Sequence, residues 1–213
     1  MTFNEDEILN MFQDFNFLSP AFDDTRVDEL VLYLFDKGYI FNYDFGATKL
    51  VIIPRNKDYV IKIPFQGYYK NDCFYNFIGA DSEFKWDYCN VEVERYENIY
   101  STSFKDCFAE TIFIGYANNY PIYLQEKCTP FNGSYNKTKE KRKKMNSFLR
   151  KIDCYYELNP DWCIDLLKYY GPKRFKEFLI LIKKFKWVDD LTYDNVGYKN
   201  GYPIIIDFSG FRE

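Results

Sequence analysis

The chain has 213 residues, of which 47% are hydrophobic and 22% aromatic, so it can bury one good core or two small ones and is not expected to be disordered. A formal net charge of −4 gives no overall attraction to nucleic acid or to anionic membranes. The chain has no histidine, which excludes serine–histidine catalysis, cysteine–histidine catalysis and histidine-bound metals, and leaves carboxylates, lysines and oxygen-bound cations for any chemistry.

The first 65 residues predict two helices followed by strands. Apolar residues recur at helical spacing within 4–18, which predicts a short N-terminal helix packed on the body of the protein. Thr25 and Asp28 resemble a capping box, and the apolar face that follows predicts a helix over 26–37. Residues 39–65 change to strand-forming residues with one internal turn, which predicts an antiparallel meander.

The rest of the chain predicts one helix, two strands, a run of helices and two final short strands. In order, these are an irregular aromatic-rich segment at 66–88, a helix at 89–101, strands at 108–116 and 120–127, and helices at 137–152, 160–170 and 172–186. Asn118-Asn119 is a good hairpin turn between the two strands, and Lys199-Asn200-Gly201 is a turn between the last two. The pattern as a whole predicts an α+β chain.

The six cysteines have no C-x-x-C spacing, which indicates neither a zinc cluster nor a close disulfide framework and favours a reducing cytoplasm. The segment 1–7 lacks a charged-then-apolar signal, and no apolar run approaches the ~20 residues that span a bilayer. We therefore expect a soluble, cytoplasmic protein with no membrane partner. The abundance of tyrosine and phenylalanine, 21 and 22 residues, is typical of an AT-rich genome such as that of a phage or a low-GC bacterium.

Three motifs carry residues suited to phosphoryl transfer. Lys62 lies in an apolar strand, Tyr-Val-Ile-Lys-Ile, where an ammonium must either reach water or have an anionic partner. Asp190 and Asn195 form a D-x-x-x-x-N segment, and Asp207 ends an Ile-Ile-Ile strand within Asp-Phe-Ser-Gly. Phosphoryl transfer needs a cation on the phosphates, oxygen ligands on a metal and a carboxylate beside the attacking hydroxyl. These residues supply all three in the right chain order.

This ordered set resembles the protein kinase-like superfamily over about residues 39–213. The resemblance implies an α+β, two-lobed fold. In it, 1–38 would be a helical extension, and 39–127 a small lobe with a five-stranded antiparallel sheet and one helix. A reduced, mainly helical lobe at 128–213 would carry the catalytic and metal-binding loops.

The resemblance also implies a role for each motif residue. Lys62 would hold the phosphates of ATP and pair with a glutamate on the helix at 89–101. We choose Glu92, since apolar residues follow it four and seven positions later, whereas Glu94 faces a different direction and is the alternative. Asp190 would be the base that orients the acceptor hydroxyl and accepts its proton. Asn195 and Asp207 would bind magnesium.

Two stretches of the resemblance concern the nucleotide. The expected phosphate loop, 43–49, has a single glycine, so backbone amides from Gly46 to Thr48 would grip a phosphate in a different shape from a glycine-rich loop. The carbonyl of Glu126 and the amide of Cys128 are expected to meet adenine. The metal motif reads Asp-Phe-Ser-Gly rather than Asp-Phe-Gly, and no Ala-Pro-Glu motif follows it, so recruitment of peptides in the usual way is not expected.

A basic segment at 137–151 holds eight lysines and arginines against one acid, Glu140. It is suited to an acidic protein partner or to nucleic acid, and a solvated helix face is an equally good interpretation. The leading hypothesis is thus a minimal ATP- and magnesium-dependent phosphotransferase whose acceptor, a protein or a small molecule, the sequence does not name. Nucleotidyl transfer is a variant of it. The alternative is a pseudokinase-type binding module, for example a phage or mobile-element protein that binds a host factor.

Overall fold

The structure is a computed structural model that describes residues 1–19, 21–70, 73–76, 87–131, 138–152, 158–184, 191 and 195–209. The chain divides into two compact units. Unit 1 consists of 1–94 and 110–127, and unit 2 of 95–109 and 128–213. The boundary falls within helix α3 (Tyr88–Tyr100).

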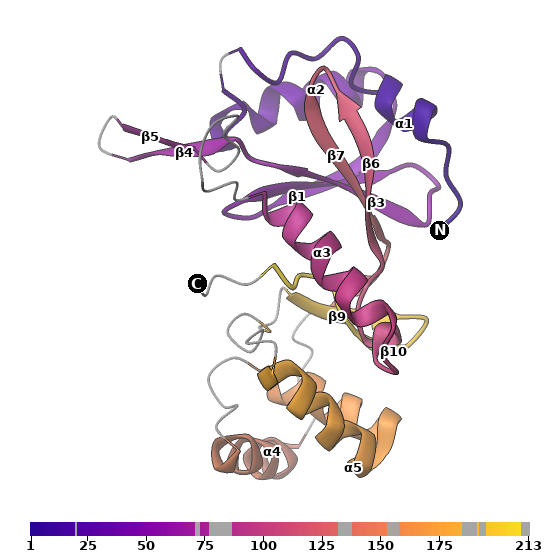
Figure 1. Ribbon diagram of the computed structural model, residues 1–213, viewed down its shortest axis with the longest axis vertical. Helices are drawn as coiled ribbons and strands as arrows, with labels where there is room; N and C mark the ends of the chain where they lie inside the picture. The colour runs from indigo at the N-terminus through magenta and orange to yellow at the C-terminus, as the bar shows by residue number, and fades with distance from the viewer. Residues whose placement is uncertain are drawn as a thin grey trace. The chain divides into compact units, whose positions relative to one another are not determined.

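Unit 1 is built on a five-stranded antiparallel sheet with the strand order β1-β2-β3-β7-β6 (Figure 1). The strands are β1 (Ile40–Phe45), β2 (Lys49–Pro54), β3 (Tyr59–Pro64), β6 (Thr111–Ala117) and β7 (Tyr120–Glu126). The predicted meander and the predicted hairpin are both confirmed. In the β6–β7 turn, Asn118 and Asn119 adopt φ of 49° and 64°, the left-handed conformation that a two-residue hairpin turn requires.

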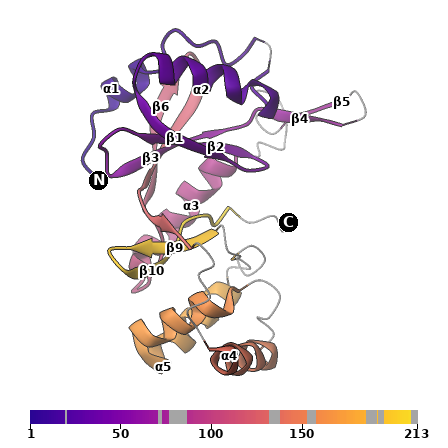
Figure 2. The same ribbon diagram turned by 180° about the vertical axis from the view of Figure 1, so that it is seen from behind.

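The two faces of this sheet have different chemistry because successive residues of a strand point to opposite sides. On one side lie helices α1 (Glu5–Asn10) and α2 (Val27–Asp36), and the figures show them above the same face of the sheet (Figure 2). The strand residues that share a core with these helices are Leu50, Ile52, Ile61, Ile63, Ile122 and Leu124. The intervening residues face the other way, toward the start of α3, and include Lys49, Lys62 and Gln125.

The N-terminal residues belong to the core of unit 1. The helix predicted over 4–18 is shorter, since α1 ends at Asn10, yet the phenylalanines after it pack into the same core. Phe17 stacks on Tyr120 with ring centroids 4.7 Å apart. The Asn118 amide donates to the carbonyls of Gln13 (2.7 Å) and Phe15 (2.8 Å), which holds the segment in a non-helical path.

The second predicted helix is present, but its cap differs from the prediction. It starts as a 3-10 turn, Asp24–Arg26, and continues as α2. Asp23, not Thr25, is the capping residue, because the Asp23 carboxylate accepts from the Thr25 backbone N–H at 3.0 Å and from its hydroxyl at 2.6 Å. The prediction of a Thr25–Asp28 capping box is therefore wrong.

The aromatic-rich segment at 66–88 is not irregular throughout. It contains a hairpin of β4 (Gly67–Lys70) and β5 (Cys73–Asn76), in which Tyr68 pairs with Tyr75 and Tyr69 with Phe74. Aromatic residues favour extended backbone, so a strand signal was present. The segment lacks a regular alternation with polar residues, and the two residues between the strands, Asn71 and Asp72, are neither Gly nor Pro.

Unit 2 combines helices with a small three-stranded sheet. The helices are α4 (Lys139–Lys151) and α5 (Pro160–Lys184), and the strands are β8 (Thr129–Pro130), β9 (Val196–Lys199) and β10 (Tyr202–Ile205) in the order β10-β9-β8. Gly171, with φ 75° and ψ 167°, interrupts α5 directly before Pro172, so the two helices predicted here meet at the expected break. Asn200 and Gly201 turn the chain between β9 and β10 with positive φ, as predicted.

The α+β class and the five-stranded antiparallel sheet are confirmed. Within the described residues, no helix has both the length and the apolar character that crossing a membrane requires.

Candidate functional site

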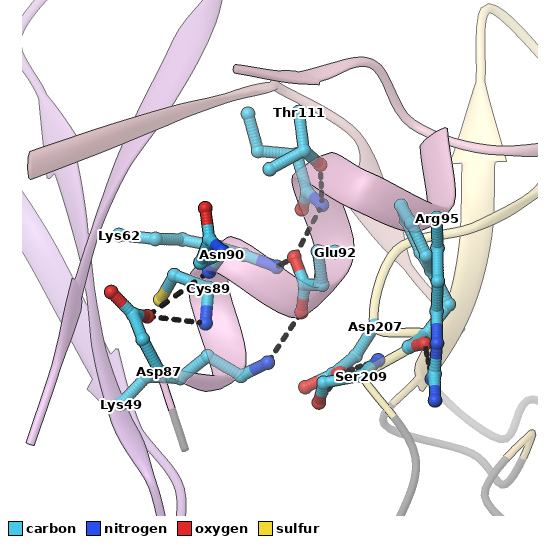
Figure 3. A network of polar contacts seen from close by, with 12 residues as sticks. Lys49, Lys62, Asp87, Cys89, Asn90, Glu92, Arg95, Thr111, Asp207 and Ser209 are labelled. Carbon is cyan, nitrogen blue, oxygen red and sulfur yellow. Dashed lines mark hydrogen bonds and ion pairs between the residues drawn. The ribbon is translucent and has the colours of Figure 1, made fainter. Parts of the chain in front are cut away.

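Lys62 and Glu92 form a buried ion pair in unit 1. The Lys62 ammonium donates to Glu92 Oε2 at 2.7 Å, and only 3% of Lys62 and 0% of Glu92 is exposed (Figure 3). Glu94, the alternative partner, is exposed and accepts instead from the Asn90 amide at 2.8 Å. The glutamate that meets Lys62 is thus the one chosen from the apolar spacing of the helix.

A second lysine, Lys49, approaches the same carboxylate and was missed in the sequence. It is the first residue of β2, is 4% exposed, and donates to Glu92 Oε1 (Figure 3). In the β2–β3 register Val51 lies opposite Lys62, and Lys49 shares a face of the sheet with Val51. Alternation within β2 puts Lys49 and Val51 on one face, but only the register of β2 with β3 shows that Lys62 shares this face.

Gln125 fixes the orientation of the glutamate from β7. Its amide Nε2 donates to Glu92 Oε2 at 3.3 Å and to the Thr111 hydroxyl at 2.8 Å. Because Gln125, Thr111 and Glu92 are all buried, each of these bonds is shielded from water. Glu92 therefore accepts hydrogen bonds at both of its carboxylate oxygens, which holds its side chain in one orientation.

Asp87 ties the start of α3 to the sheet. Its Oδ1 accepts from the backbone N–H groups of Cys89 (2.9 Å) and Asn90 (3.0 Å), and its Oδ2 accepts from the hydroxyl of Tyr123 on β7. Burial raises the pKa of the Asp87 carboxyl, while the Tyr123 bond and the two backbone amides oppose that rise. This cap sets the position of Glu92, which lies on the next turn of the helix.

In unit 2, the two predicted metal ligands lie at the same end of the β9–β10 hairpin. The carbonyl oxygen of Asn195 accepts from the backbone N–H groups of Ile206 (2.9 Å) and Asp207 (3.2 Å). The next pair in the register, Val196 and Ile205, continues the ladder. The hairpin therefore brings Asn195 and Asp207 together although they are separated by eleven residues in the chain.

The Asp207 side chain is oriented by the residue two positions later. Its Oδ1 accepts from the Ser209 hydroxyl at 3.0 Å and from the Ser209 backbone N–H at 3.3 Å (Figure 3). Carboxylate and amide oxygens suit Mg²⁺, which keeps several waters and needs few protein ligands when phosphates supply the others. Asn195 and Asp207 fit such an ion. Among the described residues, no group of three or more Asp, Glu, Cys or His could hold a metal ion, at this place or at any other.

Phe208 anchors the Asp-Phe-Ser segment within unit 2. Its carbonyl accepts from the Arg95 guanidinium, and its ring lies edge-on to Phe108 with centroids 5.5 Å apart. Phe208 is 2% exposed, so the segment around Asp207 is fixed by packing as well as by hydrogen bonds.

The predicted base, Asp190, lies outside the described residues. Its neighbour Leu191 is described and is 1% exposed. The Leu191 carbonyl accepts from the backbone N–H of Asn159 at 3.1 Å, which joins the chain directly after Asp190 to the start of α5.

The predicted nucleotide contacts are in the following places. Gly46 lies in the β1–β2 loop, and its N–H donates to the carbonyl of Lys49 at 3.0 Å. The Thr48 carbonyl accepts from the Phe65 N–H at 2.8 Å. Glu126 is the last residue of β7 in unit 1, and Cys128, two residues later, is partly exposed and belongs to unit 2.

No protein-family model matches the chain, and no curated protein matches it. Among solved structures, the chain is similar to a spectinomycin phosphotransferase in complex with ADP and spectinomycin, at 15% sequence identity and a TM-score of 0.31. The match covers 78% of this chain and 65% of that one, so this chain spans about two thirds of the length of the solved protein. The roles proposed below rest on residues of this chain.

Proposed function

We propose that this protein is an ATP- and magnesium-dependent phosphotransferase that transfers the γ-phosphoryl group to the hydroxyl of a protein or small-molecule acceptor. The observation that carries the proposal is the buried pair of Lys62 and Glu92, joined at 2.7 Å between β3 and α3. Burying two opposite charges costs several kcal/mol per ion before their attraction offsets it. A cation held at a fixed place in this way is suited to phosphate oxygens.

In the proposed reaction, the acceptor oxygen attacks the γ-phosphorus and the bond from that phosphorus to the β-phosphate oxygen breaks. Asp190 accepts the proton of the acceptor hydroxyl, and ADP leaves with the bonding electrons. Lys62 donates to phosphate oxygens, and Glu92 holds it in place.

Asn195 and Asp207 would bind the magnesium ion through their side-chain oxygens. When bound, the ion would offset the negative charge that develops on the phosphate oxygens. The contribution of the chain is to hold both side chains at one end of the β9–β10 hairpin, where Ser209 keeps the Asp207 carboxylate in one orientation.

The test measures binding and transfer together. The wild-type protein is expected to show a rise in Tm with ATP and magnesium, and to transfer label from γ-labelled ATP to itself or to components of a lysate. Lys62→Ala and Asp207→Ala should each lower transfer by about a hundredfold or more. Label that is transferred from α-labelled ATP instead would assign nucleotidyl transfer.

Matched controls come from the surface of each unit. Lys57 on unit 1 pairs with Glu7 at the surface, and Asp106 on unit 2 is exposed. Lys57→Ala and Asp106→Ala should retain full transfer. Wild-type protein that neither gains Tm with ATP and magnesium nor transfers label ends the proposal.

A second candidate function is a binding module that uses α4. The exposed cations of this helix are Lys139, Lys141, Lys143, Lys144, Arg150 and Lys151. Met145 and Leu149 face inward, and Arg142 pairs with the buried Asp161 of α5 at 3.0 Å, so the helix is fixed to unit 2 while its cations point outward. Lys137, the first cation of the predicted basic segment, lies outside the described residues. An acidic protein partner fits this surface.

Charge reversal separates the two candidates. An acidic partner protein should be retained by a variant that combines Asp190→Ala with Asp207→Ala, and lost when Lys139, Lys141, Lys143 and Lys144 are changed to Glu. Equal binding after the charge reversal would remove the binding-module candidate. A salt-dependent shift of an RNA probe would assign the helix to nucleic acid instead.

A further inference from the structure

The loop between β1 and β2 uses its glycine to close the hairpin. The Gly46 N–H, which is one of the backbone amides expected to grip a phosphate, donates to the Lys49 carbonyl at 3.0 Å. A glycine-rich phosphate loop works by presenting several backbone N–H groups to an anion. The expected loop at 43–49 has one glycine, and the amide of that glycine is engaged in the fold.

A lysine side chain is present where this loop ends. Lys49 is the last residue of the expected phosphate loop and the first residue of β2, and it turns its side chain to the face of the sheet that carries Lys62. The two ammoniums bond to different oxygens of Glu92, Lys49 to Oε1 and Lys62 to Oε2 (Figure 3). One carboxylate therefore holds two cations close together on adjacent strands.

This arrangement is costly if it serves only to fill the core. Both lysines are at least 95% buried, and two like charges near one another add Coulomb repulsion to the cost of desolvating them. An apolar side chain of similar volume at position 49 would avoid both costs. The same pair of lysines would bind a polyanion more tightly than one lysine alone, because adjacent phosphates carry oxygens that two neighbouring ammoniums can bind together.

We propose that Lys49 is a second phosphate-binding cation, which acts with Lys62 on a di- or triphosphate and takes the place of the backbone amides of a glycine-rich loop. The inference deepens the proposed function and rests on it for the identity of the ligand as a nucleotide. Each ammonium has three N–H donors, so a lysine that donates to Glu92 also has the capacity to donate to phosphate oxygens. Glu92 fixes the spacing of the two cations.

The experiment compares variants of Lys49 that differ in charge and in whether they keep a donor to Glu92. Lys49→Gln removes the charge, Lys49→Arg keeps it, and Lys49→Met removes both donor and charge. Lys57→Gln is the matched control, since Lys57 lies at the surface of the same unit and pairs with Glu7 at 3.0 Å. The probes are inorganic tripolyphosphate, ATP with magnesium, and adenosine, and the readouts are the change in Tm and the Kd.

Lys49→Gln should bind tripolyphosphate and ATP about tenfold to a hundredfold more weakly than wild type, which corresponds to the loss of one charge-assisted contact. Lys49→Arg and Lys57→Gln should stay close to wild type. Adenosine, which has no phosphate, should bind all variants alike. If Lys49→Met does not fold, the comparison of Lys49→Gln with Lys49→Arg still decides whether the charge at position 49 contributes to phosphate binding.

The outcomes separate this inference from the proposed function. Wild-type protein that binds ATP with an affinity unchanged in Lys49→Gln overturns the inference and leaves the phosphotransferase proposal standing. A second outcome is that the wild-type protein binds tripolyphosphate but not ATP, and that Lys49→Gln loses this binding. That result supports the role of Lys49 in binding phosphates and excludes a nucleotide as the ligand. Binding of neither anion by the wild-type protein overturns both.

Discussion

The backbone N–H of Asn159 donates to the carbonyl oxygen of Leu191 at 3.1 Å, while the side chain of Asn159 caps α5. The Asn159 Oδ1 accepts from the buried N–H groups of Asp161 (2.9 Å) and Trp162 (3.2 Å). One residue thus fixes both the first turn of a helix and the chain beside Asp190. A change that moves the cap is therefore expected to move Leu191, which follows the proposed base directly in the chain.

Asn159→Ala should lower the free energy of unfolding by about 1–2 kcal/mol, because it removes the cap acceptor from two buried N–H groups. Urea unfolding measures this loss. Transfer activity at a temperature where the variant stays folded should also fall, through the Leu191 contact.

Asn159→Ser is the matched control for the cap. A serine hydroxyl can accept from the same N–H groups. The substitution also removes the buried Asn159 Nδ2, which has no hydrogen-bond partner among the described residues. Ser should restore most of the stability lost in Asn159→Ala. Equal losses in the two variants would show that packing around position 159, and not the cap, is what matters.

Glu92→Ala should be among the most destabilising single changes in unit 1. It removes the carboxylate to which two buried ammoniums donate, and breaking a buried ion pair from one side costs about 3–5 kcal/mol. Glu94→Ala, two residues away on the exposed face of the same helix, should stay within about 0.5 kcal/mol of wild type. Comparable losses of unfolding free energy in the two variants would mean that the ion pairs of Glu92 do not stabilise unit 1.

The sequence was sufficient to predict the pair of Lys62 and Glu92 because both signals are local. A lysine within an apolar strand needs a partner, and the apolar spacing on the helix selects one glutamate of two. Lys49 begins its strand, so nothing in its immediate neighbours marks it as buried. Its role depends on strand register, which is a tertiary property.

The first helix is also shorter than its sequence predicts. Helical spacing continues through Phe12 and Phe15, but α1 ends at Asn10, and Asn118, more than a hundred residues later, donates to carbonyls beyond that end. The break at Gly171-Pro172 was predictable without a long-range contact, since glycine and proline act through their own backbones. The Asp23 cap was missed although it is local, because Asp23 and Thr25 lie two residues apart and both are residue types that cap helices well.

Asp87→Asn tests the pH dependence of the α3 cap. Burial raises the folded-state pKa of Asp87 above its usual value of 3.8. A raised carboxyl pKa contributes stability that is fully present below the unfolded-state pKa and is lost as pH rises through the folded-state pKa. Asparagine caps as well as aspartate and does not titrate. The stability of Asp87→Asn relative to wild type should therefore increase from about pH 4 upward and then level off.

Urea unfolding of both proteins at a series of pH values measures this difference. Asp87→Ala is the control, because it loses the acceptor for the Cys89 and Asn90 N–H groups and should be less stable than Asp87→Asn at every pH. A difference between Asp87→Asn and wild type that decreases with rising pH would contradict the raised pKa.

Gly197→Ala tests the support beneath Asn195. A Cβ at position 197 would lie 2.4 Å from the carbonyl oxygen of Thr129 on β8, and this contact is with backbone, so β8 or β9 must move. We expect a loss of about 1–3 kcal/mol in the free energy of unfolding. Because Asn195 precedes β9 directly, the shift should also weaken magnesium-dependent binding of ATP.

Gly46→Ala is the control for this prediction. A Cβ added at Gly46 has nothing within 4 Å, and the φ of Gly46 lies outside the left-handed region, so this variant should be as stable as wild type or slightly more stable. If Gly197→Ala unfolds at the same urea concentration as Gly46→Ala, then β8 and β9 do not pack as closely as described, and the hairpin that holds Asn195 beside Asp207 loses its support.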